Sequence, residues 1–301
     1  MITSVLTPEQ IKKSEELLNR IRSDEGELFS DYVNKDEDKK YDAIENGMVR
    51  FFDDGENSGV FASLIFFGMF RIFIAFEKDT DKYTQELSDL IHSAKEKNSG
   101  IPAVVYFIAE QKKLIEGLQK SIKFDQANYY AAHEFIMDRK HFKGFINDKN
   151  LEIRPFEADK IGDYARLLDQ AMTFVSLPTN FQGDLPGLAE RVERVKENAF
   201  YTFYKDNELV GLYWLDNDFY TIDIMAVAPA HQRKGYGGII LSHAINNVFT
   251  AQKIAATGEK FETAKLYCVD WNEKGLAFYK KYGMIKKGHT YAVNLAMEVE
   301  L

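Results

Sequence analysis

The residues whose types and spacing could do chemistry lie between Ile222 and Gly238. A predicted strand ends here at Pro229, and a basic, glycine-rich turn then opens a predicted helix. Glycines leave backbone N–H groups uncovered, and the N-terminus of a helix attracts anions. Arg233 and Lys234 add positive charge at the same place. The segment therefore predicts a turn that binds phosphate, with glycines at Gly235, Gly237 and Gly238.

Two other phosphate-binding motifs do not fit this turn. In a dinucleotide-binding fingerprint the glycines follow a strand directly, whereas residues 228–234 stand between strand and glycines here, and the spacing is G-x-G-G. A nucleotide-binding P-loop needs Gly-Lys followed by Ser or Thr, and the segment has neither. The sequence argues against both kinds of nucleotide site.

The turn resembles the signature of the GNAT family of acyltransferases. That signature is Gln or Arg, two residues, Gly, one residue, then Gly or Ala, which corresponds here to Gln232, Gly235 and Gly237. The resemblance implies that the turn binds the pyrophosphate of acetyl-coenzyme A, and that the preceding strand pairs through its backbone with the pantetheine arm. The residues implied in cofactor binding are Ala226, Val227, Gln232, Arg233, Lys234, Gly235, Tyr236, Gly237, Gly238 and Asn272.

A second segment, 272–284, extends the resemblance. It looks like the family's pattern of Asn, Ala, Phe-Tyr and a closing Gly-Phe, with Met284 in place of the usual Phe. By resemblance, Asn272 would approach the coenzyme A arm and Tyr279 would stand near the sulfur. A phenol in that position can give a proton to a leaving thiolate, so Tyr279 is the candidate acid. The alternative interpretation of Tyr279 is a core aromatic residue on a short helix.

The general base is less well defined by the sequence. Thr221 stands where some family members have a Glu, and a hydroxyl cannot serve as the base. The two-residue period of a strand places Asp223 on one face with Thr221, Met225 and Val227. Asp223 is therefore the candidate catalytic base, with Asp216 or Asp218 as alternatives. Asp223 could equally bind a cationic substrate or sit at a solvated strand edge.

The other residues with reactive side chains favour structural roles. Cys268 alternates with Leu266 on a predicted buried strand, which favours a core thiol over a nucleophile. His231 lies in the turn and could contact the cofactor. The remaining histidines lack the spacing of metal ligands, so no metal is predicted; they are His92, His133, His141, His243 and His289.

Composition limits the class of protein. A length of 301 residues predicts about two domains, and a formal net charge of -9 argues against nucleic-acid binding and favours a cationic amine substrate. The N-terminus has no secretory signal pattern, and the apolar run 60–76 is interrupted by polar residues, so we expect a cytoplasmic protein without a membrane segment. Homodimer formation is left open.

Both halves show the same order of predicted elements. Hydrophobic periodicity predicts first-half helices at about 8–22, 80–96 and 110–122, with strands at 60–66, 70–76, 102–109 and 129–137. Second-half helices are predicted at 158–170, 235–251 and 273–282, with strands at 200–205, 209–215, 219–227, 264–270 and 291–299. This order favours a duplicated α/β (α+β) fold over two unrelated α/β units, with residues 1–148 and 151–301 as GNAT-like domains. Each would have a mixed, mostly antiparallel sheet flanked by helices.

The first half lacks the features of the phosphate-binding turn. Its equivalent segment, Phe76–Asp81, has no glycine and three carboxylates, which would repel a pyrophosphate. The first domain is therefore expected to have no cofactor site and to serve as a structural or substrate-shaping partner. A further segment, Met172–Gly187, lies where the family places the walls of the acceptor site, and it is either a lid or ordinary packing.

Two main functions follow from these features. The first is an acetyl-CoA-dependent N-acyltransferase acting on a primary amine of a small molecule or peptide. The second is a non-catalytic protein that binds acyl-CoA as a sensor or scaffold. A tandem interaction module in which neither half binds coenzyme A is a minor third alternative.

Overall fold

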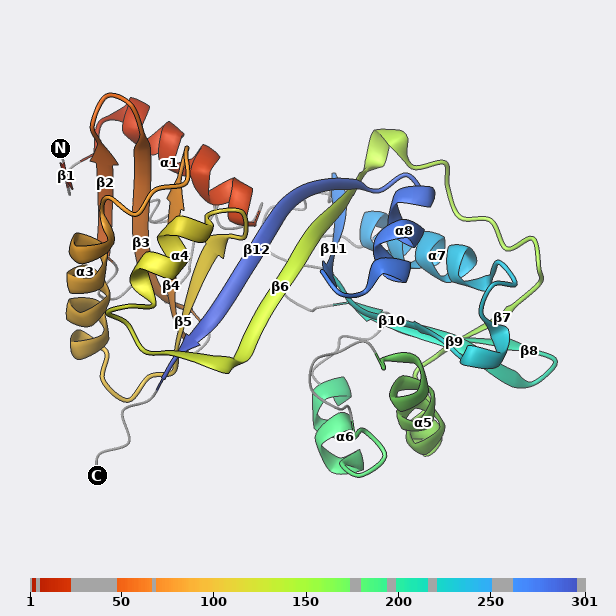
Figure 1. The fold of residues 1–301 in the computed structure, drawn as a ribbon. Coiled ribbons are helices and arrows are strands. Elements are labelled where there is room, and N and C mark those ends of the chain that lie inside the picture. The colour runs from red at the N-terminus through yellow and green to blue at the C-terminus, as the bar shows by residue number, and fades with distance from the viewer. Residues whose placement is uncertain are drawn as a thin grey trace. The chain divides into compact units, whose positions relative to one another are not determined.

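The chain folds into two compact units (Figure 1). Unit 1 comprises Met1–Glu134 and Lys287–Leu301, and unit 2 comprises Phe135–Lys286. The computed structural model describes residues 2–3, 6–22, 48–66, 69–173, 180–193, 199–215, 221–250 and 262–296. No helix within these ranges is long and apolar enough to cross a membrane.

The units do not coincide with the division expected near residue 150. Strand β6 (Phe124–Asp138) begins in unit 1 and ends in unit 2, whereas β12 (Ile285–Leu295) begins in unit 2 and ends in unit 1. Unit 1 therefore contains the end of the chain. The register of β12 against β5 (Ala103–Ile108) is antiparallel, from Thr290 with Ile108 to Asn294 with Val104.

The first helix of unit 1 is marked clearly by the sequence. In α1 (Pro8–Ile21), Thr7 and Gln10 form the expected capping box, and Leu17, Leu18 and Ile21 are buried. Its sheet has the order β1-β2-β3-β4-β5-β12-β6. The other elements are β1 (Ile2–Thr3), β2 (Met48–Asp53), β3 (Ser58–Phe66), β4 (Met69–Phe76), α3 (Thr84–Lys97) and α4 (Lys112–Leu118).

Alternating apolar residues explain the core of unit 1. Phe70, Ile72, Ile74 and Phe76 on β4 belong to one buried cluster with the apolar residues of α3 and α4. Helix α1 packs against β3, β4 and β5. The predicted strands at 60–66 and 70–76 are confirmed, and α3 begins four residues later than the predicted helix at Thr80.

Unit 2 has a sheet of order β6-β11-β10-β9-β8-β7. Helices α5 and α6 cover one face of this sheet and α7 covers the other (Figure 1). The strands are β7 (Glu152–Pro155), β8 (Phe200–Lys205), β9 (Glu208–Leu215), β10 (Ile222–Val227) and β11 (Thr263–Val269). The helices are α5 (Ile161–Ala171), α6 (Leu185–Glu193), α7 (Tyr236–Thr250) and α8 (Glu273–Lys281).

The two units repeat one pattern of strand pairing. In each, antiparallel pairs (β2–β3–β4 and β8–β9–β10) are followed by a parallel pair, β4–β5 or β10–β11. The parallel pairs differ in extent. In unit 1 the register of β4 with β5 runs from Phe70 with Ala103 to Ile74 with Phe107, whereas the described residues of β10 and β11 pair only at Ile222 and Leu266.

Candidate functional site

Strand β10 has an unpaired edge on the side where β11 lies. Because these two described strands pair only at Ile222 and Leu266, the rest of β10 has no strand partner on that side. The N–H of Ala228 donates to the carbonyl of Val210 on β9, 2.9 Å away, so by strand alternation the backbone of Ala226 also faces β9. The groups directed at the open edge are then those of Met225 and Val227. Of the two residues expected to pair with an extended ligand, Val227 directs its backbone groups at the open edge and Ala226 directs them at β9.

The turn after β10 has the backbone geometry of an anion-binding concavity. Arg233 has φ of 60° and Gly235 has φ of 90°, and such left-handed residues turn successive N–H groups toward one point. Among the described residues, the backbone amides of 233–237 donate to no backbone carbonyl. Helix α7 begins at Tyr236, so its positive dipole end lies at the same place.

The glycines of the turn also permit close packing of α8. A Cβ atom on Gly237 would lie 3.2 Å from Cε2 of Phe278, and one on Gly238 would lie 2.2 Å from the hydroxyl of Tyr282. Both aromatic residues belong to the segment 272–284. The two sequence motifs therefore contact each other directly, and glycine at 238 is required for packing as well as for backbone access.

Two polar side chains complete the turn. Nε2 of Gln232 donates to the carbonyl of Val227 over 3.0 Å, which ties the turn to the end of β10. The side chain of Lys149 crosses Gly235, with its Cε 3.0 Å from where a Cβ would stand. The sequence gives no indication of Lys149, because it lies 86 residues before Gly235 and only the fold brings the two together.

Tyr279 lies beside Cys268 in unit 2. Its ring packs on Phe135, with centroids 5.6 Å apart, and burial raises the pKa of its phenol, with a smaller contribution from the nearby Cys268. Cys268 is buried as expected, and desolvation, followed by the charge of Asp270, raises the pKa of its thiol to about 12. A neutral thiol is a poor nucleophile, which supports a packing role for Cys268.

Asn272 is the N-cap of α8. Its Oδ1 accepts a hydrogen bond from the backbone N–H of Gly275, 2.9 Å away. A Cβ on Gly275 would lie 2.5 Å from Nδ2 of Asn272. The side chain thus fixes the start of the helix that carries Tyr279.

A β-bulge at Asp223 changes the face of β10 on which this residue lies. Ile222 pairs with Leu215 and Ile224 with Trp214, so Asp223 is the extra residue. Ile224 belongs to the buried cluster under α5 and α6, whereas Met225 and Val227 pack with the cluster under α7. Asp223 contacts residues on the α5 and α6 side. The predicted common face for Asp223, Met225 and Val227 is therefore wrong.

Asp223 is held by two donors at one oxygen. Nε1 of Trp214 and an η-nitrogen of Arg191 each lie 2.9 Å from its Oδ2. Arg191 is on α6, and its guanidinium also lies over the Trp214 ring, 5.6 Å from the centroid. The alternative bases Asp216 and Asp218 lie outside the described residues, as do Phe174 and Pro178 of the predicted lid.

These features of unit 2 agree with comparisons with known proteins. Residues 196–283 match the family model of the acetyltransferase (GNAT) domain. The chain is 10% identical to a GCN5-related N-acetyltransferase from Sphaerobacter thermophilus, with a TM-score of 0.51 over 100% of this chain and 97% of that one. A Drosophila protein is 15% identical, with a TM-score of 0.52 over 97% of each chain. A search of the curated proteins found no match.

At these identities the structural likeness shows the fold. The mixed α/β architecture, with a mostly antiparallel sheet flanked by helices, is the GNAT fold, as expected from the sequence. The family match spans β8 to α8 and therefore includes the turn at 232–238 and the segment 272–284. Both motifs lie in unit 2.

The end of β4 in unit 1 differs from the turn that follows β10 in unit 2. Gln111, 2% exposed, donates through Nε2 to the carbonyl of Phe76 and accepts from its N–H. Asp79 accepts from the amides of Lys113 and Leu114 at the start of α4. Side chains of unit 1 thus occupy the end of β4 and the nearby amides.

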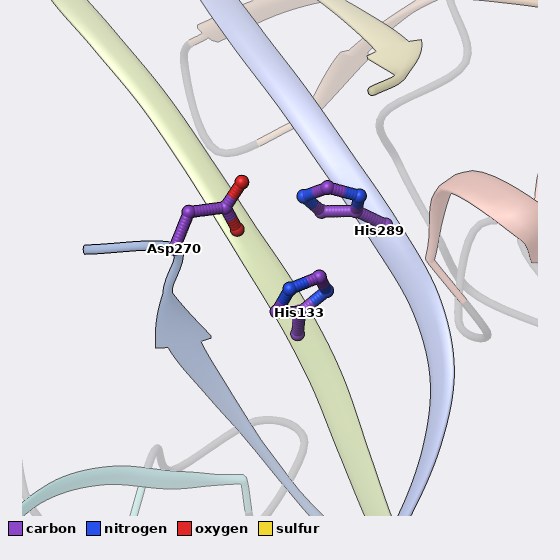
Figure 2. Close-up of side chains that lie close together, drawn as sticks. All are labelled: His133, Asp270 and His289. Carbon is purple, nitrogen blue, oxygen red and sulfur yellow. The ribbon is translucent and has the colours of Figure 1, made fainter. Parts of the chain in front are cut away.

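Two histidines of unit 1 come together although their sequence positions are far apart. The rings of His133 on β6 and His289 on β12 have centroids 4.0 Å apart (Figure 2). Nδ1 of His289 lies 2.8 Å from Oε1 of Glu110. Spacing along the chain could not show this pair, since it depends on where β12 joins the sheet.

Proposed function

We propose that unit 2 is an acetyl-CoA-dependent N-acyltransferase that acts on a primary amine. The observation that carries the proposal is a set of three features: the turn at 233–237 with its left-handed residues, the open backbone edge of Met225 and Val227 that leads into it, and the phenol of Tyr279 beside Cys268 on the neighbouring strand β11. An anion, an extended amide arm and a leaving group would meet these features in that order.

The length of the arm supports the position of the reacting atoms. A pantetheine arm with two amides is about as long as three or four residues of extended chain, or roughly 10–14 Å. Counted back from Val227, that distance reaches the bulge at Asp223. Ile222 pairs with Leu266, and Ile224 and Cys268 each lie two residues further along their strands. Tyr279 lies beside Cys268, so it is at about the same level of the sheet as the bulge.

The proposed chemistry assigns each proton. Acetyl-CoA supplies a thioester carbonyl carbon to the acceptor nitrogen. Asp223 takes one proton from an ammonium acceptor, either directly or through a water molecule; in the described part of the chain its Oδ1 makes no hydrogen bond. As the C–N bond forms and the C–S bond breaks, Tyr279 gives its proton to sulfur and recovers the second proton lost by nitrogen. The products are an amide and a thiol.

Unit 1 is proposed to be a GNAT-like domain without a cofactor site. The long parallel pairing of β4 with β5, the closure by Gln111 and the carboxylates of its turn all oppose an extended anionic ligand. Its role would then be structural, or to shape the acceptor site. The repeated strand order of the two units supports a tandem origin.

Calorimetric titration with acetyl-CoA tests the proposal. Lys234→Glu is the informative variant, because Lys234 is exposed and its replacement disturbs no packing, whereas a side chain at Gly237 would also press on Phe278. Lys280→Glu makes the same charge change on the exposed side of α8. We expect about one equivalent to bind the wild type and Lys280→Glu, with Lys234→Glu weaker by about tenfold or more.

Turnover separates the two remaining functions. Acetylation of any amine in a panel, followed by release of free thiol, supports the transferase. Binding of acetyl-CoA without turnover on any amine would favour the sensor or scaffold. Absence of binding to the folded wild type would exclude both functions.

A further inference from the structure

We infer that the acceptor is an amine that also carries a carboxylate, and that Arg191 binds that carboxylate. This inference rests on the proposed transferase function. Arg191 and Asp223 form an ion pair of 2.9 Å at the bulge, where the proposed mechanism locates the reacting carbonyl. The two charges of the pair match those of an amino acid, with the amino group at Asp223 and the carboxylate at Arg191.

The geometry leaves Arg191 able to bind a second anion. Its side chain is 50% exposed, and Asp223 receives only one of its N–H groups in the described structure. A guanidinium has five N–H donors in a planar fork, which suits a carboxylate with two parallel bonds. In an ordinary surface ion pair both side chains move freely, so neither is held in an orientation that suits a second ligand.

Trp214 fixes the orientation of both members of the pair. It is 1% exposed, and its Nε1 donates to the same Oδ2 that receives Arg191. The guanidinium lies over its ring, which favours a cation there. The pair therefore rests on a rigid, buried aromatic side chain. This support distinguishes it from the exposed pair of Arg166 with Asp163 on α5, which spans one turn of a single helix.

The charge arrangement also disfavours a second class of acceptor. The second ammonium group of a diamine would lie beside the guanidinium of Arg191, and the two positive charges would repel each other. The acidic net charge of the chain describes its whole surface and favours a cationic amine, whereas the charges at the bulge favour a zwitterion.

The test compares amino acids with the amines left when their carboxylate is removed. The acceptors are glycine with methylamine, β-alanine with ethylamine, and 4-aminobutanoate with propylamine, with 1,3-diaminopropane as the dication. For each pair, kcat/KM is measured at saturating acetyl-CoA with the wild type, Arg191→Met and the control Arg166→Met. We expect at least one amino acid to exceed its counterpart by about 10- to 100-fold, the value of a hydrogen-bonded charge pair.

The variants decide whether Arg191 is responsible. Arg191→Met should lower that ratio about tenfold or more, mainly through KM for the amino acid, and Arg191→Lys should restore part of it. Arg166→Met should leave the ratio unchanged. Equal rates for amino acid and amine, faster acetylation of the diamine, or an unchanged ratio in Arg191→Met would each overturn the inference. If wild type binds acetyl-CoA and turns over simple amines in those cases, the proposed function stands and only the acceptor class fails.

Discussion

Gln111 joins both backbone groups of Phe76 to the end of β5. Its Nε2 donates to the Phe76 carbonyl over 2.5 Å, and its Oε1 accepts from the Phe76 N–H over 3.3 Å. In unit 2 the carbonyl of Val227 at the end of β10 is instead bound by Gln232, 3.0 Å away, from its own turn. The first arrangement links two parallel strands, and the second leaves them apart.

We predict that Gln111→Leu destabilises unit 1 by about 1–3 kcal/mol, because the buried N–H of Phe76 loses its partner and the Phe76 carbonyl keeps only the hydrogen bond from Arg20. Hydrogen exchange of the β4 and β5 amides measures this effect within unit 1. Gln85→Leu is the matched control, since Gln85 is exposed on α3 and bonds only Asp89 in the described structure. Equal exchange in the two variants would contradict the closing role of Gln111.

We predict that Tyr279→Phe lowers kcat by about 10²- to 10³-fold, because the leaving sulfur loses its proton donor. The affinity for acetyl-CoA should change little, since the ring and its packing on Phe135 remain. Tyr282→Phe removes a hydroxyl three residues further along the same segment and serves as the control. Single-turnover rates with calorimetric affinities provide the measurement, and a rate near wild type would remove Tyr279 from the mechanism.

Much of the fold follows from local sequence patterns. The capping box of Thr7 and Gln10 correctly marks the start of α1, and the run Phe200–Lys205 is β8 as predicted. Strand β7 was missed, because its burial does not alternate and it pairs only with β8. Helix α6 was missed because Pro186 and Gly187 read as loop, although proline is acceptable in a first helical turn.

The parts that the sequence could not predict depend on long-range pairing. The bulge at Asp223 is invisible in an alternating pattern, yet it moves this residue to the face of Arg191. The passage of β12 into unit 1 depends on its register with β5. The contact of Lys149 with Gly235 depends on the fold of unit 2. The glycine-rich turn before α7 was predictable, since it is formed by consecutive residues.

Arg233 adopts a left-handed backbone at a cost in stability. A non-glycine residue there loses about 1 kcal/mol, so Arg233→Gly should raise the free energy of unfolding of unit 2 by about that amount. The same change removes a cation from the turn and should weaken acetyl-CoA binding. Lys234→Gly, at a position without positive φ, should weaken binding without the gain in stability. Urea unfolding measures the free energy of unfolding of both variants, and calorimetry measures their affinity for acetyl-CoA. Together they show whether the backbone strain at residue 233 and acetyl-CoA binding depend on the same residue.

His243 on α7 makes unit 2 sensitive to acid. Its Nδ1 lies 2.9 Å from the hydroxyl of Tyr213, which also accepts from Asn247, so the hydroxyl proton points at the imidazole. Rings of Phe145 and Tyr201 lie 4.9 and 5.0 Å away, and desolvation lowers the pKa of His243 to about 4. A protonated imidazole would lose its acceptor nitrogen in this apolar surrounding.

The direction of the pH effect follows from proton uptake. An unfolded histidine has a pKa of about 6.5, so between pH 6.5 and 4 the unfolded chain binds a proton that the folded unit does not. The contribution of His243 is fully present above pH 6.5, falls as the pH drops, and levels off below pH 4 after a loss of roughly 3 kcal/mol. Trp214 and Trp271 both lie in unit 2, so tryptophan fluorescence during urea unfolding follows this unit. His243→Gln should flatten the pH dependence over that window, and an equal slope in wild type and variant would show that other groups cause it.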